Sequence, residues 1–153
     1  AHLRTARGNV FWIAEMLAKR EVIQILSHTE VFVCPSIYEP LGIVNLEAMA
    51  CEAAVVASAV GGIPEVVRDG VTGTLVHYDA ATDGSGTPRD PARFAADLAE
   101  AIDNLLADPV RTRDMGLAGR ARAIAEFSWT AVAERTVGLY RDLLDAGPLR
   151  DGS

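Results

Sequence analysis

Residues 35–51, PSIYEPLGIVNLEAMAC, hold the densest set of residues that could do chemistry. A predicted strand ends at Pro35, and a helix is expected to begin near Ile43, directly after Gly42. The free backbone amides of Gly42, Ile43 and Val44 would then point out of the helix N-terminus, a geometry that attracts anions and phosphate above all. In an open parallel sheet, ligands bind beyond the carboxyl ends of the strands, where this turn falls. The turn is therefore a predicted phosphate-binding site.

Two glutamates, Glu39 and Glu47, flank this turn eight residues apart. Carboxylates suit neutral hydroxyls better than phosphate, because each can accept a pair of hydrogen bonds from a sugar or ribose diol. The spacing alone is weak evidence, since Glu126 and Glu134 repeat it without a glycine turn and are interpreted as a coincidence. A carboxylate that only complements the helix dipole explains Glu47 equally well. The residues alone leave both interpretations of Glu47 open.

A second glycine turn, Gly61-Gly62-Ile63-Pro64-Glu65, follows another predicted strand. Either its backbone approaches the ligand closely, or it is an ordinary strand-to-helix turn. The two cysteines and three histidines are isolated in the sequence, so we predict no metal site and interpret the cysteines as buried free thiols. These residues are Cys34, Cys51, His2, His28 and His77.

The elements that must position these residues alternate short apolar runs with helical patterns, which predicts an α/β fold. We expect a Rossmann-like parallel sheet of about four strands with helices on both faces, built from βα units over 1–78. A loop over 79–90, C-terminal helices over 91–146 and a tail over 147–153 follow. The expected strands are Val10–Ile13, Val31–Pro35, Ala54–Ala59 and Thr74–Tyr78. The expected helices are Lys19–Ser27, Ile43–Cys51, Pro64–Arg68, Pro91–Ala107, Pro109–Phe127 and Thr130–Leu144, and Trp12, Trp129 and Tyr140 are expected to be core anchors.

Composition limits the possible partners of the chain. The 153 residues carry a formal net charge of -7, which argues against nonspecific binding to nucleic acid or to an anionic membrane surface. No apolar run approaches the roughly 18 residues that a membrane span needs. We therefore expect a cytoplasmic protein without a nucleic-acid or membrane partner.

Two stretches together resemble a known family. VFVCPSIYEPLGIVNLEAMAC, followed by VVASAVGGIPEVVRDGVTGTLV, is similar to the donor-binding lobe of glycosyltransferase family 4, whose members have the GT-B fold. The segment SIYEPLGIVNLEAMACE, with NVFWIAEMLAKREVIQILSH upstream, most resembles actinobacterial glycogen synthases. The resemblance implies a retaining glucosyltransferase that uses ADP-glucose or UDP-glucose as its donor, without a further cofactor or metal. The implied acceptor is an α-1,4-glucan or glucose 1-phosphate.

The resemblance also assigns roles to individual positions. Glu39 would face the hydroxyls of the donor sugar as the catalytic-site carboxylate. The amides of Gly42, Ile43 and Val44 would hold the sugar and diphosphate, and Glu47 would bind the ribose. Gly61 and Gly62 would form part of the wall of the site.

The chain departs from the family pattern at its beginning. A GT-B enzyme needs a second lobe that supplies the acceptor site, and the Arg…Lys pair that neutralises the departing diphosphate would lie upstream of Asn9. The chain also starts at Ala1 without a methionine. We therefore expect a C-terminal fragment that is inactive alone, because electrostatic stabilisation is often the largest catalytic contribution. Its sheet edge at Val31–Pro35 would lack a neighbour, so self-association through this edge is a further prediction.

Two alternatives remain open. Another family 4 transferase, acting on a lipid or trehalose-type acceptor, would share this donor lobe. A noncatalytic nucleotide-sugar-binding or interaction module, including a receiver-like α/β domain, is the alternative from a different class. A receiver would need acidic residues clustered at strand ends, where this chain has Pro35, Ser36 and Gly61.

Overall fold

Three parallel strands form the centre of the fold in the computed structural model, which describes residues 8–146. They are β1 (Val31–Cys34), β2 (Ala54–Ser58) and β3 (Gly73–Val76), and they lie in the order β1-β2-β3. Every residue of the central strand β2 is buried. A strand covered on both faces needs apolar side chains at every position, which explains the unbroken run Ala54–Ala57. The predicted α/β class and parallel sheet are confirmed.

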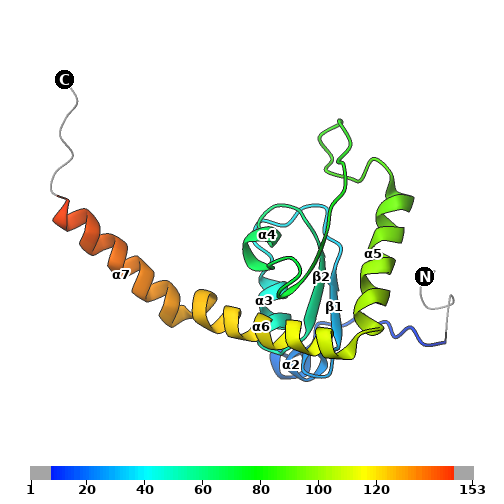
Figure 1. Cartoon of the computed structure of the whole chain (residues 1–153), viewed down its shortest axis with the longest axis horizontal. Coiled ribbons are helices and arrows are strands. Elements are labelled where there is room, and N and C mark those ends of the chain that lie inside the picture. Colours follow the sequence, from blue (N-terminus) through cyan, green and yellow to red (C-terminus); the bar gives the residue numbers. More distant parts are fainter. Residues whose placement is uncertain (1–7, 147–153) are drawn as a thin grey trace.

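Helices cover both faces of this sheet (Figure 1). Helix α5 (Pro91–Leu106) packs on one face, where Phe94, Ala101 and Leu105 meet Ala54 and Val56 of β2. On the other face, α3 (Ile43–Ala50) and α4 (Ile63–Val66) contribute Met49, Ile63 and Val66 to a core that contains Val55 and Ala57. The remaining helices are α2 (Lys19–Leu26), α6 (Pro109–Phe127) and α7 (Trp129–Asp145).

Side-chain caps set the first residues of the long C-terminal helices. Asp90 accepts a hydrogen bond from the amide of Arg93 at 2.9 Å, and Asp108 accepts one from the amide of Arg111 at 3.0 Å. In both cases a proline, with its fixed φ and missing N–H, occupies the first helical position. Ser128 caps α7 in the same way, 3.2 Å from the amide of Ala131.

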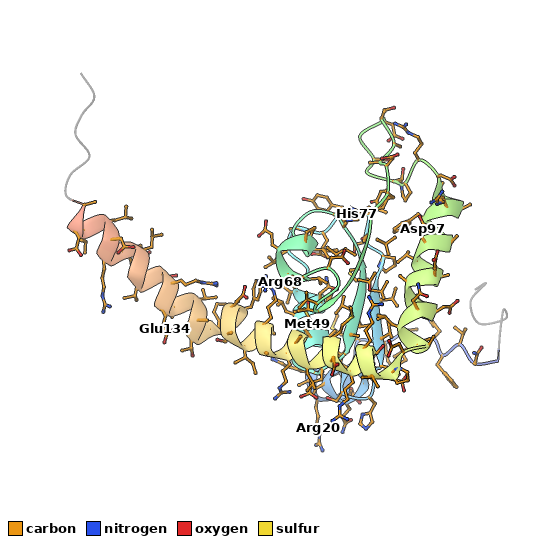
Figure 2. The ribbon with its side chains drawn as sticks, viewed as in Figure 1. Arg20, Met49, Arg68, His77, Asp97 and Glu134 are labelled. Carbon is orange, nitrogen blue, oxygen red and sulfur yellow. The ribbon has the colours of Figure 1, made fainter. Side chains whose placement is uncertain are left out.

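Helix α6 holds α3 in place through small residues and one arginine. A Cβ on Gly116 would overlap the carbonyl oxygen of Glu52, and one on Gly119 would lie 3.2 Å from Cγ of Met49. Figure 2 shows Met49 between these two helices. Arg120 donates to the carbonyl of Ala50 at 2.9 Å, which satisfies a free carbonyl at the end of α3. The helix that carries the predicted site is thus fixed at its C-terminal end by α6.

Over residues 8–146 the sheet has three strands rather than about four, because the predicted strand Val10–Ile13 is wrong. This segment is irregular, with Phe11 and Trp12 exposed. A four-residue apolar run cannot become a strand without an adjacent edge to pair with, and its sequence does not reveal whether one exists. Among residues 8–146 the outer edge of β1 pairs with no other strand. Self-association through that edge stays a prediction.

The expectation that Trp12, Trp129 and Tyr140 anchor the core is also wrong. Their exposed fractions are 58%, 89% and 62%. Trp129 and Tyr140 belong to α7, which extends away from the α/β body, and none of its side chains is buried (Figure 1). Its apolar stripe has the predicted helical period, but period alone does not say whether a neighbour covers the stripe. Within the described range, no helix is long and apolar enough to cross a membrane.

Candidate functional site

The turn between β1 and α3 is tied to the neighbouring strand by a buried serine. Ser58, at the end of β2, donates its hydroxyl to the carbonyl of Ser36 and lies 3.4 Å from the carbonyl of Cys34. Ser58 is fully buried, so these contacts are shielded from water. The chain that leaves β1 is therefore held against the carboxyl end of β2, where a parallel sheet places its ligands.

The two glycine turns pack directly on each other. The amide of Gly62 donates to the main-chain carbonyl of Glu39 at 3.0 Å. A Cβ on Gly61 would overlap the same carbonyl, and one on Gly62 would lie 2.7 Å from Cα of Leu41. Gly61 also has a φ of +53°, which L-residues rarely adopt. Only glycine fits at both positions, because the backbone there packs directly against the turn that carries Glu39.

Glu39 folds back over the N-terminus of α3. Its Oε1 accepts a hydrogen bond from the amide of Gly42 at 2.9 Å and lies 3.4 Å from the amide nitrogen of Leu41. Gly42 makes this possible with a left-handed φ of +90°. The carboxylate therefore interacts with the positive end of the helix dipole.

The next two amides of α3 remain open. No carbonyl or side chain in the described part of the chain accepts from the amides of Ile43 or Val44. Both residues are exposed, as expected for the first turn of a helix whose N–H groups have no intrahelical partner. The helix N-terminus therefore presents two free amides, within residues 8–146, beside one that Glu39 occupies.

Glu47 lies one turn further along α3, on the same face as Ile43. It is exposed, and no hydrogen bond or ion pair engages its carboxylate within residues 8–146. It lines a hollow of about 560 Å³ between α3 and the junction of α6 and α7. The structure thus brings Glu39, Gly42, Gly61 and Gly62 into contact. Glu47 does not contact them and lies on the solvent-exposed face of α3.

Asn45 belongs to this site, and the sequence reasoning missed it. Its side chain is 0% exposed, yet neither Nδ2 nor Oδ1 has a hydrogen-bond partner among the described residues. Nδ2 lies 2.7 Å from the position that a Cβ on Gly42 would occupy. Leaving a buried amide unpaired costs about 1–3 kcal/mol, so such groups are rare in folded proteins. The sequence offers one sign of this role, the polar side chain of Asn45 between the apolar residues Val44 and Leu46.

The loop over 79–90 approaches the site from the side of β3. Tyr78 donates its hydroxyl to the carbonyl of Gly86 at 3.0 Å, and a Cβ on Gly86 would lie 3.2 Å from the carbonyl oxygen of Ile37. Within the loop, hydrogen bonds from the hydroxyl and amide of Ser85 lower the pKa of the exposed Asp83 carboxyl. The loop is therefore internally ordered and borders the β1–α3 turn.

A separate hollow of about 540 Å³, lined by charged and polar side chains, lies between the end of β3 and α5. Figure 2 shows His77 and Asp97 on its two sides. Within it, Arg93 pairs with Asp97 at 3.1 Å across one turn of α5. No group of three or more histidine, cysteine, aspartate or glutamate side chains is arranged to hold a metal ion in the part of the chain described.

Comparison with known proteins identifies the family. The model of the family described as "Glycosyl transferases group 1" matches residues 1–122. The α-maltose-1-phosphate synthase of Mycolicibacterium smegmatis is 59% identical over 139 residues, which cover 91% of this chain and 34% of that protein. A D-inositol 3-phosphate glycosyltransferase of Segniliparus rotundus is 37% identical over 147 residues, covering 96% of this chain and 29% of that protein. A glycogen synthase of Mycobacterium tuberculosis is 36% identical over 120 residues, covering 78% of this chain and 26% of that protein.

Solved structures agree with this assignment. Sucrose-phosphate synthase from Thermosynechococcus elongatus superposes with a TM-score of 0.62 at 43% identity, covering 80% of this chain and 27% of that one. Anabaena HepE in complex with UDP superposes with a TM-score of 0.62 at 26% identity, covering 78% of this chain and 29% of that one. The chain spans about a third of the length of the curated relatives that it matches. With its parallel sheet, its covering helices and its glycine turns at the carboxyl edge, the chain belongs to the group 1 glycosyltransferases.

Proposed function

We propose that this chain is the donor-binding part of a retaining glucosyltransferase that takes glucose from ADP-glucose or UDP-glucose. The observation that carries the proposal is the N-terminus of α3, where no group in the described part of the chain accepts from the amides of Ile43 and Val44, beside the amide of Gly42. Such amides bind phosphate oxygens, because the helix dipole and the N–H groups point the same way. A nucleotide sugar offers a diphosphate of the required charge.

In this proposal each site residue has a separate role. Gly42, Ile43 and Val44 hold the sugar and diphosphate, while Glu47 accepts hydrogen bonds from the ribose hydroxyls on the open face of α3. Glu39 faces the hydroxyls of the donor sugar, and Gly61 and Gly62 form the wall that fixes the Glu39 turn. The exposure of Glu47 supports its role, since its carboxylate is available to a ligand.

The proposed reaction transfers glucose to an α-1,4-glucan or to glucose 1-phosphate in the cytoplasm. The departing diphosphate itself accepts the proton of the acceptor on the face that it leaves, so no protein nucleophile, metal or further cofactor is needed. Another part of the enzyme, an N-terminal lobe, supplies the acceptor site. A relative named α-maltose-1-phosphate synthase at 59% identity favours glucose 1-phosphate over glucan, because the glycogen synthase relative is only 36% identical.

A second candidate function is transfer to a different acceptor by the same donor chemistry. The relative named D-inositol 3-phosphate glycosyltransferase supports it, since it matches 96% of this chain at 37% identity. The two candidates share the donor site and differ only in the acceptor. Product analysis of an enzyme that includes the acceptor lobe, offered glucose 1-phosphate, glucan or inositol phosphate, separates them.

Calorimetric titration of the chain with ADP, UDP and their glucose esters tests the donor proposal. We expect saturable binding of one nucleotide series, with chemical-shift changes at the amides of Ile43 and Val44 in matched NMR titrations. Saturable binding that leaves these two amides unperturbed would contradict the site. Failure to bind any of the four compounds would contradict the proposal that this chain binds the donor.

A further inference from the structure

The cradle at the N-terminus of α3 already contains an anion, and that anion belongs to the protein. Glu39 Oε1 lies 2.9 Å from the amide nitrogen of Gly42, one of the three amides assigned to the donor. A carboxylate and a phosphate oxygen cannot both take this N–H closely, because two anions at that separation repel each other. Diphosphate binding therefore has to displace Glu39.

Asn45 shows a second, independent sign that the ligand-free arrangement is incomplete. Its buried amide has no partner in the described part of the molecule, and Nδ2 points at the N-terminus of α3. Nδ2 and Cγ of Glu39 lie 2.7 and 3.6 Å from the same point, the position of a Cβ on Gly42. A rotation about the side-chain bonds of Glu39 can therefore bring its carboxylate towards the unpaired amide.

We propose that Glu39 is an internal occupant of the diphosphate cradle, which the donor displaces from the Gly42 amide towards the side-chain amide of Asn45. This inference rests on the proposed function, since it takes the donor to be a nucleoside diphosphate sugar. The exchange couples two events: the diphosphate gains the third amide of the cradle, and Glu39 is released to face the donor sugar. Asn45 acts as a positioning residue that receives the released carboxylate.

Affinity measurements on Glu39→Ala test the displacement. Removing the competitor should tighten binding of ADP or UDP about three- to tenfold, the scale of a partly exposed hydrogen bond to a charged group. Adenosine and uridine lack the diphosphate, so their affinities should not change. Glu65→Ala is the matched control: it removes an exposed carboxylate from the first turn of the neighbouring helix α4 and should leave ADP and UDP affinity within twofold of the parent.

A direct readout accompanies the titration. In the ligand-free Glu39→Ala chain, the amide of Gly42 should exchange with solvent faster than in the parent, while the amides of Ile43 and Val44 stay as they are. Loss of the Glu39 hydrogen bond would speed exchange at the Gly42 amide alone, whereas the loss of one negative charge would affect all three amides. A Glu39→Ala chain that binds ADP and UDP no more tightly than the parent, or a Gly42 amide whose exchange does not change, overturns the inference.

A double-mutant cycle tests the part assigned to Asn45. Asn45→Leu should weaken ADP or UDP binding in the parent, because the displaced carboxylate loses its receiving group. It should have no effect in the Glu39→Ala background, where no carboxylate is displaced. An equal effect in both backgrounds would mean a structural role only and overturn the assignment. Binding that is seen but unchanged by Glu39→Ala defeats this inference alone, whereas absence of nucleotide binding in every variant defeats the proposed function and the inference together.

Discussion

The amide of Gly62 donates to the main-chain carbonyl of Glu39 at 3.0 Å, across 23 residues of sequence. This hydrogen bond joins the turn after β2 to the turn after β1, and it fixes the backbone from which the Glu39 side chain extends. The side chain then contacts the amide of Gly42 at the start of α3. The position of the carboxylate is thus set from two directions by backbone groups, which is how a polar site is kept in a defined geometry.

Gly61→Ala should destabilise the chain far more than Gly70→Ala. Both glycines have a positive φ, but a Cβ on Gly61 overlaps the carbonyl of Glu39, whereas a Cβ on Gly70 meets nothing within 4 Å. We expect a loss of about 2–4 kcal/mol in the free energy of unfolding at Gly61 and of about 1 kcal/mol at Gly70, measured by urea denaturation. Equal losses at the two positions would mean that the close approach to Glu39 contributes nothing.

Arg122→Met should cost about 2–3 kcal/mol in the free energy of unfolding. The side chain of Arg122 is only 12% exposed and donates to the carbonyls of Glu65 and Val66 at 2.7 and 3.0 Å. Its loss leaves carbonyls at the end of α4 without a partner, and α4 follows directly on the glycine turn of the site.

Arg93→Met is the control for this substitution. Arg122 also pairs with Glu126 one turn away, and Arg93 pairs in the same way with Asp97, but the Arg93 side chain is 76% exposed. Exposed pairs of this kind contribute about 0–0.5 kcal/mol, so urea denaturation should detect little change. A loss at Arg93 as large as that at Arg122 would contradict the capping role of Arg122.

The helix starts could be predicted from the sequence, because their causes are local. Asp90-Pro91, Asp108-Pro109 and Ser128 set the starts of α5, α6 and α7 through contacts three residues away. The β1–α3 turn was also predictable, since Gly42 directly precedes a helical pattern. These features need no information about the rest of the fold.

Other features could not be predicted, because they depend on residues far apart in sequence. The packing of Gly61 and Gly62 on the Glu39 turn is a contact between two loops, and either loop alone also fits an ordinary turn. The run Val10–Ile13 has the composition of a strand but pairs with no strand among the described residues. The burial of Asn45 follows from α4 packing over the start of α3, which no helical period reveals.

Glu47→Ala should weaken nucleotide binding about 10- to 100-fold, since it removes the charged group proposed to accept the ribose hydrogen bonds. Glu134→Ala is the matched control, because Glu134 stands eight residues after Glu126 just as Glu47 follows Glu39. Its side chain lies on α7, away from the α/β body (Figure 2). Calorimetry with ADP and UDP measures both variants, and equal affinities in the parent and Glu47→Ala would remove the ribose assignment.

Glu39→Ala should mainly lower turnover in an enzyme that includes the acceptor lobe. In the proposed role the Glu39 carboxylate contacts the reacting sugar. Its loss should therefore reduce kcat by about 10- to 100-fold, the scale of a charge-assisted hydrogen bond made in the transition state. Initial-rate kinetics with varied donor separate kcat from KM. A large rise in KM with kcat unchanged would place Glu39 in donor binding rather than in the chemical step.

Asn45→Leu should raise the stability of the ligand-free chain by about 1–2 kcal/mol, although it replaces a residue of the site. The amide of Asn45 is buried without a partner among residues 8–146, so the folded state bears its desolvation cost without a compensating hydrogen bond. Leucine has the same branched shape and number of heavy atoms without polar groups, and Ile63 already provides an apolar neighbour at the start of α3.

Asn45→Ala is the control for this gain, because it removes the same polar atoms but leaves a cavity. It should be less stable than Asn45→Leu by about 2 kcal/mol or more in urea denaturation. A leucine variant less stable than the parent would mean that the amide is satisfied in solution. A more stable variant would instead mean that the chain keeps an unfavourable buried amide beside Gly42, as expected for a group whose partner arrives only with the ligand.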